Sequence, residues 1–400
     1  MAQISKIKYW LLCLVPFVMC IFQYYTAYPI IGYALFWLIE GDLKRKFNAI
    51  IKNRFALLFS TFYLLYVIGL LYSSNRDDGM FNLQVKLSII VFPLLLVSEG
   101  VMDIKKQKML IYSFITGCVI TGLIYLGYAT WKFFAQNIYE FQYMKFSLFL
   151  HPSYYSMYID MIFLFAFYLF ANEKAGLTKI EKGLLLFSVF FLELILVLLQ
   201  SKMGMFISAG LIVVLLIKYN LKYSYKMPVI MFAGMVALYF ISFHFFIGQR
   251  SRVMGAANII ITKQISAGSV ESTQVRYYVW QSAIEVIKAH PFIGVGTGNE
   301  TSAMVNQYLK DGYTGAAKES LNTHDQYLQT TVVLGGIGLL ALLACFLFPF
   351  LKCIKEKRFI YGTFLVIVAV NFLVEAMLET QSGTIFYGLF NSLLMFNFVI

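Results

Sequence analysis

The chain is a near-continuous series of apolar segments, interrupted by one long polar stretch between about Gly248 and Gln326. Of its 400 residues, 60% are hydrophobic and only 13% are charged, and the mean hydropathy is +0.74. Soluble domains carry about 25% charged residues, so this composition indicates an integral membrane protein. The apolar segments read as single helical spans, and not as the weakly alternating strands of an outer-membrane barrel.

These segments predict an all-α polytopic membrane protein with about twelve transmembrane helices, because a helix of roughly 20 residues crosses a bilayer. The polar stretch, residues 248–327, would form one large loop with short helices between the ninth and tenth spans. No internal repeat divides the sequence, so residues 1–400 are expected to form a single integral membrane domain. The expected spans cover residues 8–23, 27–41, 54–72, 86–99, 109–133, 153–171, 183–200, 203–218, 227–247, 328–350, 359–377 and 384–400.

Lysine and arginine gather in alternate loops. If the N-terminus is cytoplasmic, the inner segments hold 20 of the 32 basic residues, the short outer segments hold 5, and the polar loop holds the other 7. Cytoplasmic loops carry the excess of Lys and Arg, and long loops are exempt from this rule. We therefore expect both termini in the cytoplasm and the polar loop outside it. No basic cluster with interleaved aromatic residues predicts a nucleic-acid partner, despite the net charge of +12.

The polar loop contains a stretch of helical periodicity, RYYVWQSAIEVIKAHP, which begins at Arg276. Val279, Ala283 and Val286 recur on one face, which predicts a helix with one apolar side. Pro291 should end this helix, because the residue before a proline avoids helical geometry. At the start of the helix, Arg276 could bind phosphate through its rigid donor fork, or it could pair with an acidic neighbour.

Three alternating glycines, Gly294, Gly296 and Gly298, follow this helix. Because they follow a helix and not a strand, they do not match the dinucleotide-binding fingerprint. Two interpretations remain open at this point. The run predicts either a tight turn or a nest of backbone N–H groups that binds a phosphate.

Histidine and charged residues mark the outer ends of several spans. His324 and Asp325 stand where the tenth span begins, and a histidine there suits general-base catalysis because imidazole exchanges protons near neutral pH. Other outer candidates are Lys202 in the short turn between spans seven and eight, His151 at the start of span six, and Glu375 and Glu379 around the last outer turn.

Ionisable residues within the spans are a different class. For Asp160, Glu193 and His244 we expect interhelical hydrogen bonds more than chemistry. The five cysteines lie within or beside apolar spans, and none is in the polar loop. The sequence therefore predicts neither a disulfide framework nor a zinc site, and no metal or other cofactor is expected.

Four stretches together resemble the O-antigen ligase and polymerase superfamily of bacterial envelope glycosyltransferases. The set combines an arginine-headed helix, an HP-x-x-GVGxGN turn and an H-D-x-Y-L start of a span that leads into GxxGL. These motifs cover the C-terminal half, and the layout of spans extends the similarity over the whole chain. The stretches are RYYVWQSAIEVIKAHPFIGVGTGN (276–299), HDQYLQTTVVLGGIGLL (324–340), HPSYYSMYID (151–160) and ETQSGTIFYGLFNSLL (379–394).

The resemblance implies a metal-independent, inverting transfer of a glycan from an undecaprenyl-diphosphate donor. The family's essential loop arginine and histidine match Arg276 and His324, with Arg276 and Lys202 as the cations at the donor diphosphate. Two positions depart from the family pattern. Ser201-Lys202 stands where the family has Ser-Arg, so the charge is kept and the bidentate geometry is lost, and His324-Asp325 stands where the family has His-Asn. Supporting roles are expected for His151, Asp325 and Glu379.

The resemblance also implies a place in the cell, namely the bacterial inner membrane with the active site facing the periplasm. As a ligase the protein would use a lipid A-core acceptor, which the large polar loop favours. As a polymerase it would use a second polyprenyl-linked repeat unit. A transporter is disfavoured, because the sequence lacks the paired symmetry of that class. A scaffold that has lost activity stays open because of Lys202. Membrane lipids are the other expected partners.

Overall fold

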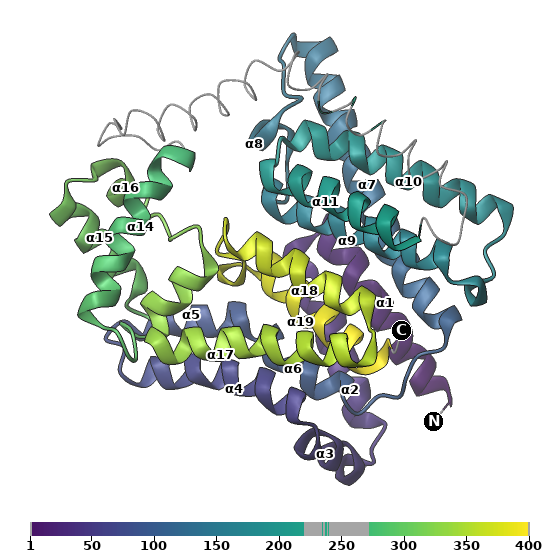
Figure 1. Ribbon diagram of the computed structural model, residues 1–400, viewed down its shortest axis with the longest axis horizontal. Coiled ribbons are helices and arrows are strands. Elements are labelled where there is room, and N and C mark those ends of the chain that lie inside the picture. Colours follow the sequence, from purple (N-terminus) through teal and green to yellow (C-terminus); the bar gives the residue numbers. More distant parts are fainter. Residues whose placement is uncertain (1, 220–233, 235–236, 238, 240–271, 399–400) are drawn as a thin grey trace.

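The computed structural model describes residues 2–219 and 272–398, together with 234, 237 and 239. In this part of the chain the structure is helical and contains no strand (Figure 1), which confirms the all-α prediction for it. Up to residue 219 the elements are α1 (Ala2–Ile21), η1 (Gln23–Tyr25), α2 (Ala27–Ile39), α3 (Leu43–Lys52), α4 (Arg54–Leu71), α5 (Arg76–Lys86), α6 (Ser88–Leu96), α7 (Ile104–Gln136), α8 (Tyr143–Phe146), α9 (Pro152–Ala171), η2 (Glu173–Ala175), α10 (Lys179–Leu199) and α11 (Lys202–Tyr219).

The second described segment begins in the polar loop and continues into the last spans. Its elements are α14 (Ser272–Ala289), α15 (Glu300–Asp311), α16 (Thr314–Lys318), α17 (Gln326–Glu356), α18 (Phe359–Phe372), η3 (Met377–Glu379), α19 (Gln381–Ser392) and the π-helical turn η4 (Leu393–Asn397).

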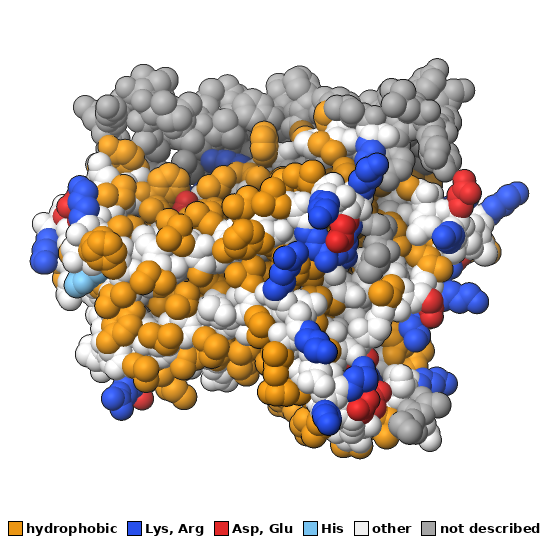
Figure 2. Space-filling model, turned by 60° about the horizontal axis from the view of Figure 1, so that its bottom comes forward, with side chains coloured by type: hydrophobic (Ala, Val, Ile, Leu, Met, Phe, Trp, Pro, Cys, Tyr) orange, Lys and Arg blue, Asp and Glu red, His pale blue; other side chains and the backbone are white. Residues whose placement is uncertain are grey.

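Among the described residues, seven helical segments are long and apolar enough to cross a membrane. They lie in α1, α4, α5 with α6, α7, α9, α10 and α17, and shorter apolar helices lie in α11 and α18. One face of the molecule shows many hydrophobic side chains over its left and central part, with charged side chains at its left edge and over its right-hand part (Figure 2). The chain is therefore a multi-pass helical membrane protein. The count of twelve spans stays a prediction, and the ninth span, 227–247, lies largely outside the described residues together with His244.

The polar loop is described from residue 272 onward, and its helices form a small unit that we call the cap (α14, α15 and α16). Helix α14 ends at Ala289, two residues before Pro291, as predicted. Its apolar face is buried against α15, where Val279 and Ala283 pack with Tyr308. The cap thus packs around a hydrophobic cluster that is distinct from the main core of the helix bundle and also includes Val332 of α17.

Helix α17 packs along α4 and is interrupted at Gly335, where φ is 64° and ψ is −162°. An interruption in a membrane helix frees backbone groups that need partners inside the protein. The segment 290–298, which we call the glycine loop, supplies these partners. Four bonds join the two segments: Val295 N–H to Val332 O (2.9 Å), Gly296 N–H to Val333 O (2.9 Å), Gly336 N–H to Pro291 O (2.8 Å) and Ile337 N–H to Phe292 O (3.2 Å).

The glycine loop is a closely packed turn. A Cβ atom on Gly298 would lie 1.8 Å from the carbonyl oxygen of Asn75, so only glycine fits against the corner between α4 and α5. The N–H groups of residues 294–298 are all hydrogen-bonded, three of them to Gly69 O, Ser73 Oγ and His290 O. This geometry supports the tight-turn interpretation, because the N–H groups that a phosphate nest requires already have partners.

Gly335→Ala should destabilise the protein by about 3 kcal/mol or more. The added Cβ would lie 2.3 Å from the carbonyl carbon of Phe292, at a backbone conformation that side chains rarely adopt. The neighbouring Gly336→Ala is the matched control, since its Cβ would come no closer than 3.3 Å to Pro291 O and its φ is not positive. Thermal unfolding in detergent measures both variants, and equal stability would contradict the proposed tight contact.

Candidate functional site

His324 has a backbone conformation that is uncommon for a residue other than glycine, with φ of 47°. Its N–H donates to the side-chain oxygen of Asn322 at 2.9 Å. The preceding residue, Thr323, is fully buried, and its carbonyl oxygen accepts from the indole N–H of Trp280 at 2.9 Å. Such a conformation costs about 1–3 kcal/mol and persists only where its surroundings enforce it, which is typical of functional sites.

Asp325 begins α17. Its carboxylate accepts the N–H of Leu328 at 2.8 Å, which is the bond of a helix N-cap. Burial raises the pKa of Asp325, and the positive charge of Arg276 partly opposes that rise. Asp325 thus fixes where α17 starts, and therefore where His324 stands.

The side chain of His324 contacts a carboxylate that lies 51 residues further along the chain. Its Nδ1 atom is 3.1 Å from Oε1 of Glu375, which lies between α18 and η3. The His324 side chain is 23% exposed and that of Glu375 is 7% exposed, so the pair lies at the edge of the buried interior. A hydrogen bond of 2.6 Å from Leu378 N–H to Gln326 Oε1 ties the two segments together.

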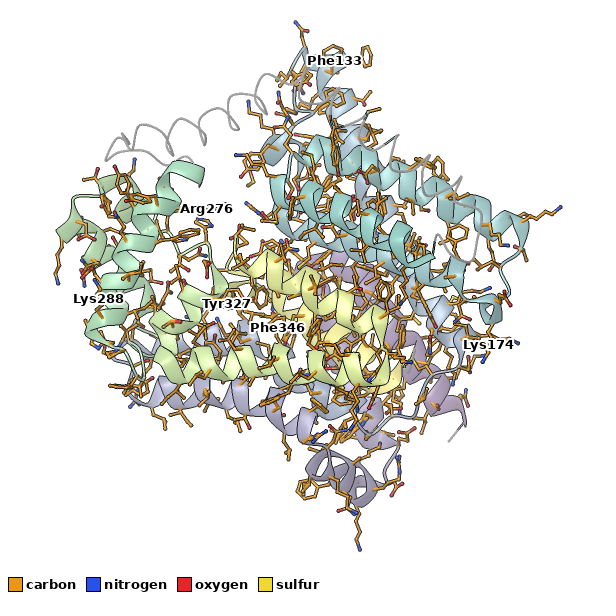
Figure 3. All side chains as sticks on the ribbon, viewed as in Figure 1. Phe133, Lys174, Arg276, Lys288, Tyr327 and Phe346 are labelled. Carbon is orange, nitrogen blue, oxygen red and sulfur yellow. The ribbon has the colours of Figure 1, made fainter. Side chains whose placement is uncertain are left out.

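Glu375 is surrounded by positively charged or protonatable groups. Burial by itself would raise the pKa of Glu375, but the contact with His324 and the charges of His151 and Arg276 bring that pKa below the ordinary glutamate value. The hydroxyl of Ser153, at the start of α9, is 3.5 Å from the second carboxylate oxygen. The electrostatic effect of Arg276 comes from α14, on which Arg276 lies on the side facing the bundle and Lys288 at the outer edge (Figure 3).

His151 occupies the N-cap of α9. Its Nδ1 atom accepts the N–H of Ser153 at 3.3 Å, so the residue has a structural role at the helix start in addition to its nearness to Glu375. The structure therefore brings together three of the residues that the sequence marks as candidates, Arg276, His324 and His151, around one carboxylate.

Lys202 follows a turn whose Ser201 is connected to the start of α9. Gln200 adopts a left-handed conformation with φ of 51°, and Lys202 then opens α11. The hydroxyl of Ser201 is 2.8 Å from that of Ser156, which donates to the carbonyl oxygen of Ser153 at 2.9 Å. A short series of hydrogen bonds thus connects the Ser201-Lys202 turn to the residue that contacts Glu375.

Glu379 lies in a different group of charges. It forms a buried ion pair with Lys86 of α5 at 2.6 Å. The charge of Glu379 also acts on Glu300, whose pKa is raised by burial first and by this neighbour second. The structure therefore places Glu379 in a contact between α5 and η3, and not at the His324–Glu375 contact.

The contact between Glu375 and His324 could not be predicted from the sequence. In the sequence, Glu375 is only one of several polar residues around the last outer turn. One signal for Glu375 exists in the sequence, since it follows an apolar helix on the same outer side as His324. Glu379 has the same property, so this signal does not distinguish the two glutamates. The pairing with His324 depends on tertiary contacts, which a single sequence does not reveal.

Chemically, this group combines an imidazole held by a carboxylate with the positive charge of Arg276 from α14. A carboxylate on one ring nitrogen orients a histidine and leaves the other nitrogen for proton transfer. In the described part of the chain, no three His, Cys, Asp or Glu side chains are close enough to hold a metal ion. The other intramembrane acids are separate from this group: Glu193 accepts from Ser208 at 3.3 Å, which bears out an interhelical bond, whereas Asp160 has no described hydrogen-bond partner.

A comparison with known families gives a match to part of the chain. Residues 186–343 match the family model described as O-Antigen ligase, from within α10 to within α17. No curated protein matches the chain. The matched region includes Lys202, Arg276 and His324, whereas His151 and Glu375 lie outside it. The match covers less than half of the chain, and it supports the resemblance to the O-antigen ligase and polymerase superfamily.

Proposed function

We propose that the protein transfers a glycan from an undecaprenyl-diphosphate donor to an acceptor hydroxyl at the site around His324. The observation that carries this proposal is the 3.1 Å contact between His324 Nδ1 and Glu375 Oε1. The charge of Arg276 acts on Glu375, and hydrogen bonds through Ser156 connect the Ser201-Lys202 turn to Ser153 beside that carboxylate. A base and cations are the two kinds of group that such a transfer requires in the absence of a metal ion.

His324 is the proposed general base. With Nδ1–H donating to Glu375, the Nε2 atom would be the one free to accept the proton of the acceptor hydroxyl. This tautomer is assigned from the contact, since hydrogen positions are inferred from hydrogen-bond geometry. Glu375 is a positioning residue in this scheme, because it acts through the imidazole and not on the sugar.

Arg276 and Lys202 are the proposed contacts of the donor diphosphate. In the reaction, the acceptor oxygen forms a bond to the anomeric carbon from the side opposite the leaving group. The bond from that carbon to the phosphate oxygen breaks, and the electron pair leaves on undecaprenyl diphosphate. Preorganised cations stabilise the charge that develops there. Attack from the opposite side inverts the configuration at the anomeric carbon.

The acceptor that we propose is a lipid A-core, which makes the protein a ligase of the inner membrane. The large polar loop, of which α14 to α16 are the described helices, supports a large acceptor site outside the bilayer. The distribution of Lys and Arg supports a periplasmic position for this site. A polymerase would use the same donor and the same groups, and would differ in the acceptor.

Purified protein with a defined undecaprenyl-diphosphate glycan, offered lipid A-core and a second donor molecule as competing acceptors, tests this function. We expect transfer mainly to lipid A-core, without added metal ion. His324→Ala should lower the rate by at least about 1000-fold while the protein still inserts and unfolds as the wild type does. Preferential chain extension on the second donor molecule would identify a polymerase. An active His324→Ala variant would contradict the base assignment.

Arg276→Lys separates charge from geometry. We expect about a 100-fold loss of transfer, because lysine keeps the positive charge but lacks the planar donor fork that fits a phosphate. Initial rates at saturating donor, together with KM for the donor, measure the effect. A fully active lysine variant would show that Arg276 acts only as a charge partner of Asp325 and Glu375.

Lys202 is tested by a pair of substitutions. Lys202→Arg should keep or increase transfer, since it restores the residue that the family has at this position, whereas Lys202→Ala should lower it by about 10- to 100-fold. Donor KM and rate are measured for both variants. If Lys202→Ala transfers at the wild-type rate, the diphosphate is bound elsewhere.

A further inference from the structure

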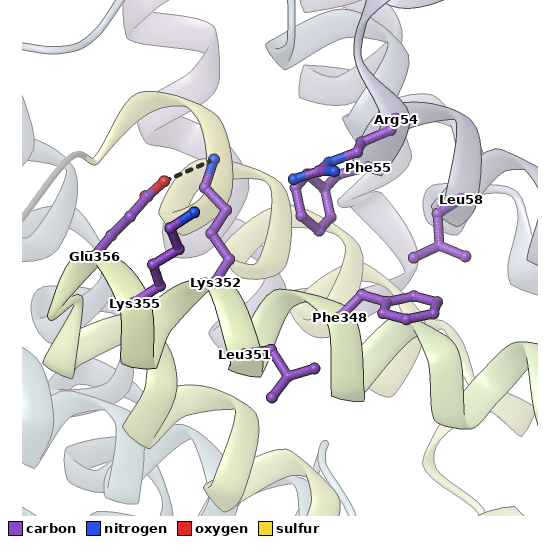
Figure 4. A pocket seen from close by; sticks show the side chains of 8 residues that line it. All are labelled: Arg54, Phe55, Leu58, Phe348, Leu351, Lys352, Lys355 and Glu356. Carbon is purple, nitrogen blue, oxygen red and sulfur yellow. Dashed lines mark ion pairs between the residues drawn. The ribbon is translucent and has the colours of Figure 1, made fainter.

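A pocket of about 560 Å³ lies between α4 and α17, at the end of α17 opposite His324. The side chains that decide its chemistry come from both helices (Figure 4). Three are basic and four are apolar: Arg54, Lys352 and Lys355, and Phe55, Leu58, Phe348 and Leu351.

The basic side chains gather at one end of the pocket. The guanidinium carbon of Arg54 and the Nζ atom of Lys352 each lie 5.3 Å from the ring centre of Phe55. Glu356 is 3.4 Å from Lys352 and is the one acidic residue in the lining, so the pocket carries a net charge of about +2 when its three basic residues and one acid are ionised. Basic side chains gathered at one end of a pocket favour an anion there.

The other end of the pocket is apolar and open toward the outside of the helix bundle. Phe348 is 54% exposed and Leu351 is 51% exposed, although both lie on a helix long and apolar enough to cross a membrane. In a bilayer these side chains would face hydrocarbon. The pocket therefore offers cations at one end and apolar walls at the other, which fits an amphiphilic anion.

The helix α3 places this pocket at the level of the lipid headgroups. Three apolar side chains, Leu43, Phe47 and Ile51, recur at every fourth position and are 52%, 62% and 50% exposed. Lysine and arginine occupy another face, and a helix of this kind lies in the membrane interface with its apolar side in the lipid. Lys46 holds α3 to the bundle, because it is fully buried and lies 3.0 Å from Glu40. Arg54 follows α3 directly, so it lies near the same depth.

We propose that this pocket binds an anionic phospholipid of the surrounding bilayer. The phosphate would lie between Arg54, Lys352 and Lys355, and an acyl chain would follow Phe348 and Leu351. Basic pockets between transmembrane helices are known to recognise anionic headgroups in this way. The site is separate from the proposed glycan donor site, because the two lie at opposite ends of α17, and it does not depend on glycan transfer.

The test uses the full-length protein purified in detergent and titrated with phosphatidylglycerol or with phosphatidylcholine of identical acyl chains. Arg54→Gln/Lys355→Gln removes two exposed charges of the pocket. Lys179→Gln/Lys182→Gln removes two exposed charges at the start of α10 and is the matched control. The melting temperature reports binding, because a ligand that binds only the folded state stabilises it.

We expect phosphatidylglycerol to raise the melting temperature of the wild type and of the control, and phosphatidylcholine to have little effect. The pocket variant should need at least about tenfold more phosphatidylglycerol for the same shift. An unchanged response of the pocket variant, or an equal response to the two lipids, would overturn the proposal. The same shift produced by inorganic phosphate would also overturn it, because the site would then recognise a free anion and not a lipid.

Discussion

The four backbone hydrogen bonds between the glycine loop and the interrupted helix α17 hold the rest of the outer region in place. A break at Gly335 would leave carbonyl and N–H groups without partners in a membrane helix, and the glycine loop satisfies them. The same loop packs against the corner between α4 and α5, with Gly298 in contact with Asn75. Cap and bundle are thereby joined within the N-terminal half of α17, and His324 precedes the start of that helix.

The candidate site depends on this arrangement because its groups come from separate elements. His324 precedes α17, Glu375 follows α18, and Arg276 belongs to the cap. Burial opposes the change, but the hydrogen bond with His324 and the surrounding positive charge lower the pKa of Glu375. The carboxylate therefore stays ionised at neutral pH and can accept a hydrogen bond from a ring N–H group. The interaction of the Glu375 carboxylate with His324 stabilises the folded protein at neutral pH. This stabilisation is lost as the pH falls through the lowered pKa of Glu375.

Much of the outer region could be predicted from local patterns. The buried face of α14, formed by Val279, Ala283 and Val286, was predicted correctly because it follows helical periodicity. The end of this helix before Pro291 was also predicted correctly, because the residue before a proline avoids helical geometry. The interruption at Gly335 was not predicted, because a glycine in an apolar run does not reveal which loop will pair with its backbone. Glu375 and Glu379 have similar sequence surroundings. Only tertiary packing decides that Glu375 contacts His324 and that Glu379 forms an ion pair with Lys86.

The central claim is that Glu375 acts on glycan transfer through His324. A double-mutant cycle of Glu375→Gln and His324→Ala, measured as single-turnover transfer from a defined undecaprenyl-diphosphate glycan, tests it most directly. We expect Glu375→Gln to lower the rate by about 100-fold in the wild type and by less than about twofold in the His324→Ala variant, since a residue that acts through the imidazole has no effect without it. Equal losses in the two backgrounds would contradict the account.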